Sequence, residues 1–301
     1  MEINKYNRKF VANDLIITTW ETLKAYFENL VNRSINSKEE YIQWLSDKSE
    51  LEAALEEDFA WRYIKMSCDT ANEDLVQSFQ YFAMEIEPKI APIGNELNKK
   101  LIESPYLKDL DQDKYFIYLR GVKKALELFR EQNIPLQTEL QVEQQKYQGI
   151  TGAMSVTLNG QEYTLEQASN FLKDLNRATR QQTWETITAR RLTDKNQLDE
   201  LFNKLKSLRH QVAQNAGFSN FRDYMFTALG RFDYTPQDCF DFHDAIEKEV
   251  VPLLSAQAQE RKNLLGLQTL KPWDTEVDSS GKAPLIPFNS GAELIEKSIR
   301  C

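Results

Sequence analysis

Histidine is the side chain that proteins use most often for proton transfer and metal binding near neutral pH, and this chain of 301 residues has only two, His210 and His243. His210 begins the sequence His-Gln-Val-Ala-Gln, which lacks the glutamate and the second histidine of the helical zinc motif His-Glu-x-x-His. His243 has Glu247 four residues later, so the two side chains would share one helix face and could supply two metal ligands. Because a catalytic zinc ion needs three protein ligands, we assign no catalytic residue and no metal ligand within this chain.

Other reactive groups are no better placed. The sequence has no Gly-x-Ser-x-Gly nucleophile elbow and no glycine-rich phosphate loop. Its three cysteines, Cys68, Cys239 and Cys301, are widely spaced and odd in number, which fits neither a disulfide framework nor a paired thiolate metal site and indicates a reducing compartment. Carboxylate runs such as Glu56–Asp58 are typical of solvent-facing helices. A hydrolase that uses scattered carboxylates is an alternative that requires a geometry not given by spacing.

The composition is that of an ordinary globular protein and excludes some partners. Hydrophobic residues make up 41% and charged residues 28% of a chain long enough to bury a core without disulfides. The formal net charge of -9 repels phosphate backbones and anionic lipids, so we expect neither nucleic acid nor a membrane as a partner. The longest apolar stretch near the N-terminus, Leu15–Ile17, is far shorter than a signal-peptide core. We therefore expect a cytoplasmic protein.

Helical spacing of apolar residues dominates the first half of the chain. A first amphipathic helix is predicted by four residues that recur three or four apart: Trp20, Leu23, Phe27 and Leu30. Ser37 and Glu40 have the spacing of a capping box, which marks the start of a helix. Apolar residues then recur about every four positions over Leu51–Met66, and together these signals predict a second and a third helix. Pro88 and Pro92 predict a break or kink within residues 72–104. Two further helices are predicted between residues 113 and 148.

One β signal interrupts the helices. Residues 154–165 alternate apolar and polar side chains around Asn159-Gly160, a pair that favours the type I′ turn of a hairpin. Helices are then predicted from Glu166 to Gln214, followed by a long helix that Thr235 caps. Prolines, glycines and serines in residues 271–289 predict a loop. The fold class that follows is all-α, mostly helical, with one small β-hairpin near residues 152–165.

Several stretches of the second half resemble the oligoendopeptidase F family, which is related to thimet oligopeptidase. They lie in the same order as in that family: Asn176 to Arg180 with Trp184, Leu208 to Ala213, Asn215 to Phe218, Arg222 to Tyr224, Gly230 to Pro236, Pro272 to Asp274, and Pro287 with Phe288. Each stretch alone is weakly specific, whereas their joint order is specific. We take the resemblance that they carry to extend over nearly the whole chain.

The resemblance implies a zinc-dependent endopeptidase that acts on oligopeptides, with two mostly helical lobes around a deep channel. Its zinc would be held by a His-Glu-x-x-His helix and a downstream glutamate, and all of these positions would lie beyond Cys301. The chain therefore looks like the N-terminal half of such an enzyme, cut within a helix that Ser290 caps. We expect residues 1–193 to form an N-terminal helical lobe that includes the hairpin, and residues 194–301 to begin the peptidase domain, truncated before the zinc motif. Alone, the chain should be inactive and hold no zinc.

Residues of the channel wall, or of contacts with the missing C-terminal catalytic segment, would come from two of these stretches. The candidates are Arg231, Asp233, Tyr234, Trp273 and Asp274. A structural interpretation competes with this one, since Arg231 and Asp233 could form a local ion pair and Trp273 could be a packing anchor.

Three further side chains at helical spacing are interpreted as a stacked structural stripe rather than an anion site: Arg177, Arg180 and Trp184. An alternative for the whole chain is a non-catalytic helical interaction or regulatory module of the same ancestry.

Overall fold

The computed structural model describes residues 7–300, so the expectation for Cys301 lies outside the described residues. The chain forms two compact units that are discontinuous in sequence. Unit 1 comprises Met1–Ala153 and Gln197–Asp233, and unit 2 comprises Met154–Asn196 and Tyr234–Cys301. These units differ from the lobes expected from the sequence, and the division at residue 193 stays a prediction. No helix among the described residues is both long and apolar enough to cross a membrane.

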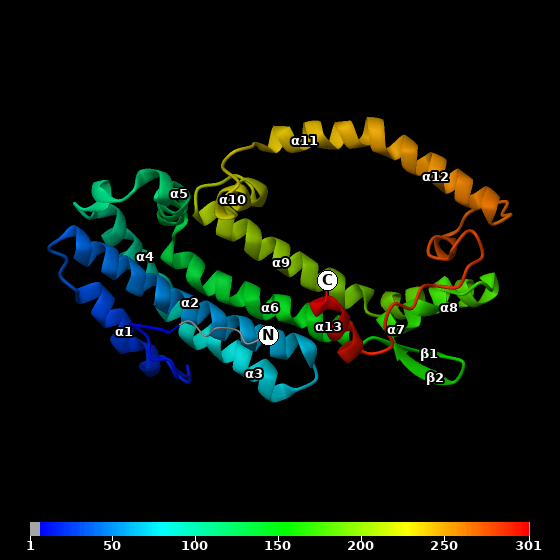
Figure 1. The fold of residues 1–301 in the computed structure, drawn as a ribbon, viewed down its shortest axis with the longest axis horizontal. Coiled ribbons are helices and arrows are strands. Elements are labelled where there is room, and N and C mark those ends of the chain that lie inside the picture. Colours follow the sequence, from blue (N-terminus) through cyan, green and yellow to red (C-terminus); the bar gives the residue numbers. More distant parts are fainter. Residues whose placement is uncertain (1–6, 301) are drawn as a thin grey trace. The chain divides into compact units, whose positions relative to one another are not determined.

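Unit 1 is helical throughout its described residues (Figure 1). Its α-helices are α1 (Glu21–Asn32), α2 (Lys38–Cys68), α3 (Glu73–Tyr81), α4 (Glu87–Glu103), α5 (Gln112–Leu128), α6 (Ile134–Gly152), α9 (Lys195–Asn215, whose first residues belong to unit 2) and α10 (Phe221–Ala228). Shorter turns connect some of them: the π-helical turn Phe82–Ile86 and the 3-10 turns Leu107–Asp109 and Glu131–Asn133.

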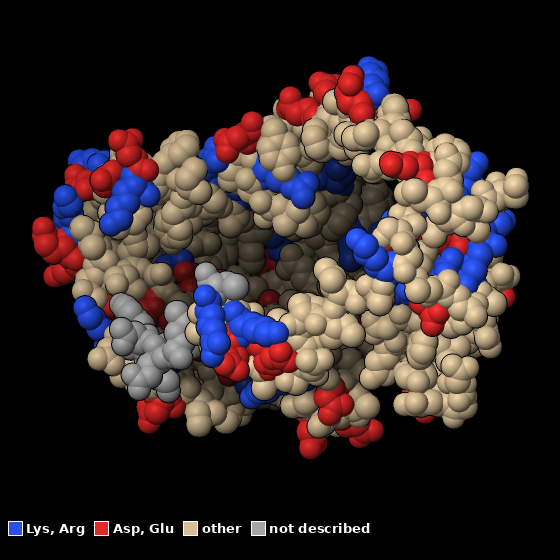
Figure 2. Space-filling model, turned by 45° about the vertical axis from the view of Figure 1, so that its right-hand side comes forward, with Lys and Arg blue, Asp and Glu red and all other residues tan. Residues whose placement is uncertain are grey.

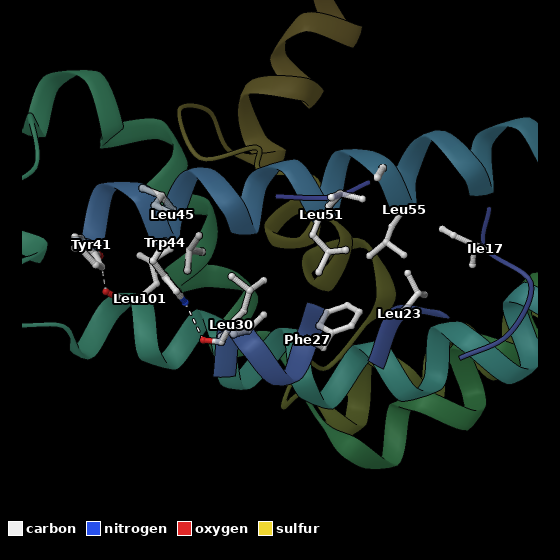
Figure 3. Packing of buried hydrophobic residues seen from close by; sticks show 14 of the residues in the cluster. Ile17, Leu23, Phe27, Leu30, Tyr41, Trp44, Leu45, Leu51, Leu55 and Leu101 are labelled. Carbon is white, nitrogen blue, oxygen red and sulfur yellow. Dashed lines mark hydrogen bonds between the residues drawn. The ribbon is translucent and has the colours of Figure 1, made fainter. Parts of the chain in front are cut away.

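The core of unit 1 lies where α1, α2 and α4 meet. Figure 3 shows Leu51 and Leu55 of α2 pointing toward α1, where Leu23 and Phe27 are buried in the same cluster. These positions are spaced three or four residues apart on each helix, as an amphipathic stripe requires. The apolar spacing that predicted α1 therefore identified its buried face correctly.

Buried polar groups in this core find backbone partners. Trp44 Nε1 donates a hydrogen bond to the carbonyl oxygen of Leu30 over 2.9 Å, and the Tyr41 hydroxyl donates to the carbonyl oxygen of Leu101 over 2.8 Å (Figure 3). Both rings are fully buried. Because a buried donor without a partner is costly, these bonds fix how α1 and α4 lie against α2.

Two expectations for unit 1 were wrong in detail. A single helix of 31 residues, α2, replaces the predicted second and third helices, since nothing between Ser37 and Met66 breaks the helix. Ser37 Oγ does accept a hydrogen bond from the backbone N–H of Glu40, but the Glu40 carboxylate accepts from Asn36 N rather than completing a capping box.

The prolines do not break the helix at residues 72–104. A π-helical turn, Phe82–Ile86, precedes Pro88, and Pro92 lies inside α4. The wider turn accommodates a residue that has no N–H and whose ring would clash with the preceding turn.

Unit 2 contains the hairpin and five α-helices within the described residues. The strands are β1 (Ser155–Leu158) and β2 (Gln161–Thr164), and the helices are α7 (Leu165–Ser169), α8 (Arg177–Thr193), α11 (Pro236–Ala245), α12 (Val251–Leu264) and α13 (Gly291–Ile299), with the π-helical turn Ile246–Val250 joining α11 to α12. Two 3-10 turns, Asn170–Lys173 and Pro272–Asp274, complete it.

The hairpin confirms its prediction. The strands pair antiparallel, and Asn159 and Gly160 adopt φ angles of 53° and 79°, as the two central residues of a type I′ turn do. The inward side chains Val156 and Leu158 pack against Ala168 of α7 and Ile187 of α8. The hairpin therefore covers a small core of its own within unit 2.

Candidate functional site

The candidates Arg231 and Asp233 lie at the end of unit 1 and do not pair with each other. The Asp233 carboxylate instead accepts two hydrogen bonds from the guanidinium of Arg120 on α5, over 2.7 and 2.9 Å. Arg231 lies over the ring of Phe226, with its guanidinium carbon 5.3 Å from the ring centroid. The alternative interpretation, a local ion pair between Arg231 and Asp233, does not hold, because α5 supplies a guanidinium that binds both carboxylate oxygens of Asp233 at once.

Arg120 is held between two aromatic rings. Its guanidinium carbon lies 5.2 Å from the centroid of Phe116 and 4.6 Å from that of Phe232. The hydrogen bonds from Arg120 hold the pKa of Asp233 below its usual range. The arrangement fixes the segment that follows α10 to α5, although the Asp233 side chain itself remains 73% exposed.

Tyr234 begins the second segment of unit 2 and is exposed. It is followed by Thr235, whose hydroxyl accepts a hydrogen bond from Asp238 N, while Asp238 accepts one from Thr235 N. This capping box, with Pro236 in the first turn, starts α11 as predicted.

The candidates Trp273 and Asp274 form a buried junction with α8 in unit 2. Asp274 accepts hydrogen bonds from Arg177 Nε and Nη2, over 2.9 and 2.8 Å, and from Arg180 Nη2 over 3.0 Å. Arg180 Nε also donates to the carbonyl oxygen of Trp273. Trp184 completes the junction, because its ring centroid lies 5.5 Å from that of Trp273.

This junction ties the loop after α12 to α8. The Asp274 side chain and that of Arg180 are 0% and 3% exposed. Burial alone would raise the pKa of Asp274, but the hydrogen bonds from Arg177 and Arg180 outweigh it and hold the pKa at about 2. The stripe of Arg177, Arg180 and Trp184 thus binds a carboxylate of the same chain.

The residues that could bind a metal are not gathered. His210 and His243 are both exposed, and nowhere in residues 7–300 do three or more histidine, cysteine, aspartate or glutamate side chains form a group able to hold a metal ion. The donor set of these residues therefore does not fit the three-ligand zinc site that the family resemblance implies.

Each unit has cavities of its own. One cavity of unit 2 has a volume of about 470 Å³ and lies between α12 and residues 270–279. Unit 1 has cavities of about 400 and 370 Å³ along α6. None of the five candidate residues from the sequence lines these cavities, so their assignment to a channel wall stays a prediction.

Charge on one face of the molecule is mixed. Figure 2 shows acidic and basic side chains interspersed on the face in view, without an extended area of one sign. This face therefore carries no continuous basic stripe of the kind that binding to a nucleic-acid backbone uses.

Sequence reasoning missed Arg120, the partner of Asp233. The two residues are 113 positions apart, and neither spacing nor charge pattern marks an arginine on α5 as a partner for that segment. Arg177 and Arg180 were singled out by their spacing, but their common partner Asp274 was assigned separately. The ion pairs of Asp274 with Arg177 and Arg180 could therefore have been predicted from the sequence, since two guanidinium groups on one helix face attract a carboxylate.

Comparisons with known proteins bear on both units. The protein-family model described as "Peptidase M3 N-terminal domain" matches residues 14–129 of the chain. A second family model, described as "Peptidase family M3", matches residues 170–295. No curated protein matches the chain.

Solved structures share the fold. The chain is similar to "PZ peptidase A with inhibitor 2", with a TM-score of 0.87 and 22% identity over 97% of this chain and 52% of that one. It is also similar to a protein described as an oligoendopeptidase F from Bacillus anthracis str. Ames, with a TM-score of 0.80 and 19% identity over 91% of this chain and 49% of that one. An oligoendopeptidase-F from Enterococcus faecium gives a TM-score of 0.69 and 13% identity, over 86% and 55% of the two chains. The chain thus spans about half the length of the structures that it matches.

Proposed function

Because this chain belongs to peptidase family M3, we propose that it is the N-terminal portion of a zinc-dependent oligoendopeptidase, an enzyme that hydrolyses peptide bonds in short peptides. The observation that carries the proposal is the succession of the two family models along one chain, the N-terminal model first. The match to only about half of each solved structure supports the view that the hydrolytic residues belong to a further segment.

The role proposed for residues 1–301 is to shape the space that peptides enter. Helices with packed cores provide rigid walls, which exclude folded proteins while admitting an extended peptide. Arg231, Asp233, Tyr234 and Trp273 remain our candidates for the wall or for contacts with the catalytic segment. Asp274 would have an indirect role, because its bond with Arg180 holds the loop that carries Trp273 against α8.

The metal would be zinc, which the catalytic segment would hold. When bound, zinc would lower the pKa of a water molecule and polarise the peptide carbonyl. The chain described here would be inactive on its own. The cysteine pattern supports a cytoplasmic location for the whole enzyme.

Reading the gene beyond codon 301 tests the proposal. We expect the open frame to continue into a His-Glu-x-x-His helix, and the longer protein to cleave a quenched fluorescent peptide in a chelator-sensitive way. A stop codon directly after Cys301 would instead favour a non-catalytic helical interaction or regulatory module. Cleavage that survives chelators would favour a hydrolase that uses carboxylates.

A further inference from the structure

One face of α6 in unit 1 carries a row of glutamines. Residues 137, 141, 144 and 148 recur three or four apart, so their side chains lie along a single stripe of the helix: Gln137, Gln141, Gln144 and Gln148. A stripe that faces a core is apolar, whereas this one is polar and only partly buried. Here it is made of amides, which have both donors and acceptors of hydrogen bonds.

The stripe lines two successive cavities of unit 1. In the first, of about 370 Å³, it faces Glu87, Pro88 and Ala91 of α4. In the second, of about 400 Å³, it faces aromatic side chains of α2 and α3. Gln141 and Gln144 line both cavities, so the two adjoin along α6 and form a groove, which we call the α6 groove.

The aromatic end of the α6 groove is built from three stacked or tilted rings. Phe59 and Phe79 stack with centroids 5.3 Å apart, and Tyr63 lies 6.1 Å from Phe79. Gln148 Nε2 donates a hydrogen bond to the Tyr63 hydroxyl over 2.6 Å, which joins α6 to α2 at this end of the groove. This end offers an apolar surface with aromatic ring faces.

The charge of the groove has one sign. Glu87 lines the first cavity and Glu56 lines the second, whereas neither lysine nor arginine is among the described residues that line either of them. Carboxylates without basic neighbours create a local negative potential, which attracts a cation.

The buried side-chain atoms of the groove that have no hydrogen-bond partner are all acceptors. Glu87 Oε2, Gln141 Oε1 and Gln148 Oε1 are shielded from solvent and have no hydrogen-bond partner among the described residues. Gln145, by contrast, accepts from Gln80 Nε2 over 3.1 Å. Shielded acceptors without partners are rare in proteins, and a bound donor would satisfy them.

We propose that the α6 groove binds a small organic cation whose ammonium or guanidinium group lies at Glu87 and Gln141. The apolar body of this cation would pack against Phe59, Tyr63 and Phe79. An ammonium or guanidinium group carries only donors, so it complements the leftover acceptors. The volumes of the two cavities, about 370 and 400 Å³, are those of small-molecule sites. The inference does not depend on the peptidase function.

The raised pKa of Glu87 provides a way to detect a cation bound at its carboxylate. Burial raises the pKa of Glu87 more than its contact with the Gln141 amide lowers it. A cation at Oε2 would stabilise the carboxylate and lower that pKa. An NMR titration of the Glu87 carboxyl carbon, with and without ligand, would report this shift directly.

Calorimetry with three probes of equal length tests the proposal on the full chain. The probes are hexylguanidinium, neutral hexanol and anionic hexanoate. We expect hexylguanidinium to bind best and hexanoate not to bind. Glu87→Gln should weaken hexylguanidinium about tenfold or more, because it removes a charged hydrogen bond, while leaving hexanol unchanged. Unchanged hexanol binding also shows that the variant groove is folded.

Matched controls separate the groove from general charge effects. Glu85→Gln changes an exposed carboxyl two residues from Glu87, and Gln77→Leu changes an exposed glutamine of α3 that lines neither cavity. Neither should alter binding, whereas Gln141→Leu should weaken hexylguanidinium. The proposal is overturned if the three probes bind alike, or if Glu87→Gln has no effect. A basic tetrapeptide that binds far more tightly than hexylguanidinium would overturn the small-ligand assignment.

Discussion

At the scale of single residues, Asp274 joins a loop to a helix through one carboxylate. Its two oxygens accept from Arg177 and Arg180, which lie three residues apart on α8, and the side chain is fully buried. Charged groups in such a place are stable only when each hydrogen-bonding atom has a partner. The loss of the carboxylate would leave the guanidinium of Arg180 buried without its counter-charge.

Asp274→Asn should therefore destabilise the chain by about 3 kcal/mol, the cost of breaking a buried ion pair from one side. Urea unfolding followed by circular dichroism measures this free energy. Asp244→Asn is the matched control, because Asp244 is exposed on α11 of the same unit. Equal stabilities for the two variants would contradict the assigned role of Asp274.

The same residue predicts a pH dependence. The pKa of Asp274 is about 2 in the folded chain, against an ordinary value of 3.8. A depressed folded pKa contributes stability above the unfolded pKa and loses it as pH falls through the folded value, here roughly 2 kcal/mol between about pH 5 and about pH 2. The stability difference between wild type and Asp274→Asn, measured in urea across that range, should shrink toward low pH. A constant difference would exclude this linkage.

At the scale of elements, the end of α1 depends on a lysine from α4. Lys100 Nζ donates to the carbonyl oxygens of Leu30, Val31 and Arg33, over 3.0, 2.7 and 2.7 Å. The last carbonyls of a helix have no partner within the helix, so a cation at that end satisfies them and opposes the helix dipole. The burial of Lys100 lowers its pKa.

Lys100→Met should cost about 2 kcal/mol, since it keeps an apolar stem but removes the side-chain donor to the part-buried carbonyl groups of Val31 and Arg33. Hydrogen exchange should also show faster opening of α1 than of α2. Lys99→Met is the control, because Lys99 is exposed one residue earlier on the same helix. Comparable losses in both variants would mean that helix propensity or general charge, and not the capping of α1, sets the cost.

Many of the helix and turn boundaries were predictable from the sequence. The apolar stripe of α1, the Asn159-Gly160 turn and the Thr235 cap are local signals, and the structure confirms each of them. Partners across the fold were not predictable. Arg120 binds Asp233 and Lys100 closes α1 through contacts that span tens of residues, which spacing along the chain does not encode. The π-helical turn before Pro88 was missed because a break and a widened turn share one sequence signal.

At the scale of the whole molecule, a large part of unit 2 is uncovered. Helices α11, α12 and α13 have no buried residue within the described chain. On α13, Leu294, Ile295 and Ile299 are 41%, 63% and 71% exposed. Exposed apolar side chains on one helix are typical of interaction surfaces, and they promote association when nothing covers them.

We therefore expect the chain to self-associate at high concentration. The double substitution Ile295→Glu with Ile299→Glu should reduce the average mass measured by light scattering. Leu192→Glu, at a leucine of α8 that is 60% exposed, should leave it unchanged. A monomeric wild-type chain at high concentration would contradict this expectation.

Elemental analysis for zinc tests the central claim, that hydrolysis requires residues outside this chain, most directly. The purified 301-residue chain, dialysed after incubation with excess zinc, should retain far less than one equivalent and should not cleave a quenched fluorescent peptide. One equivalent of tightly held zinc, together with peptide cleavage that a chelator abolishes, would contradict the account.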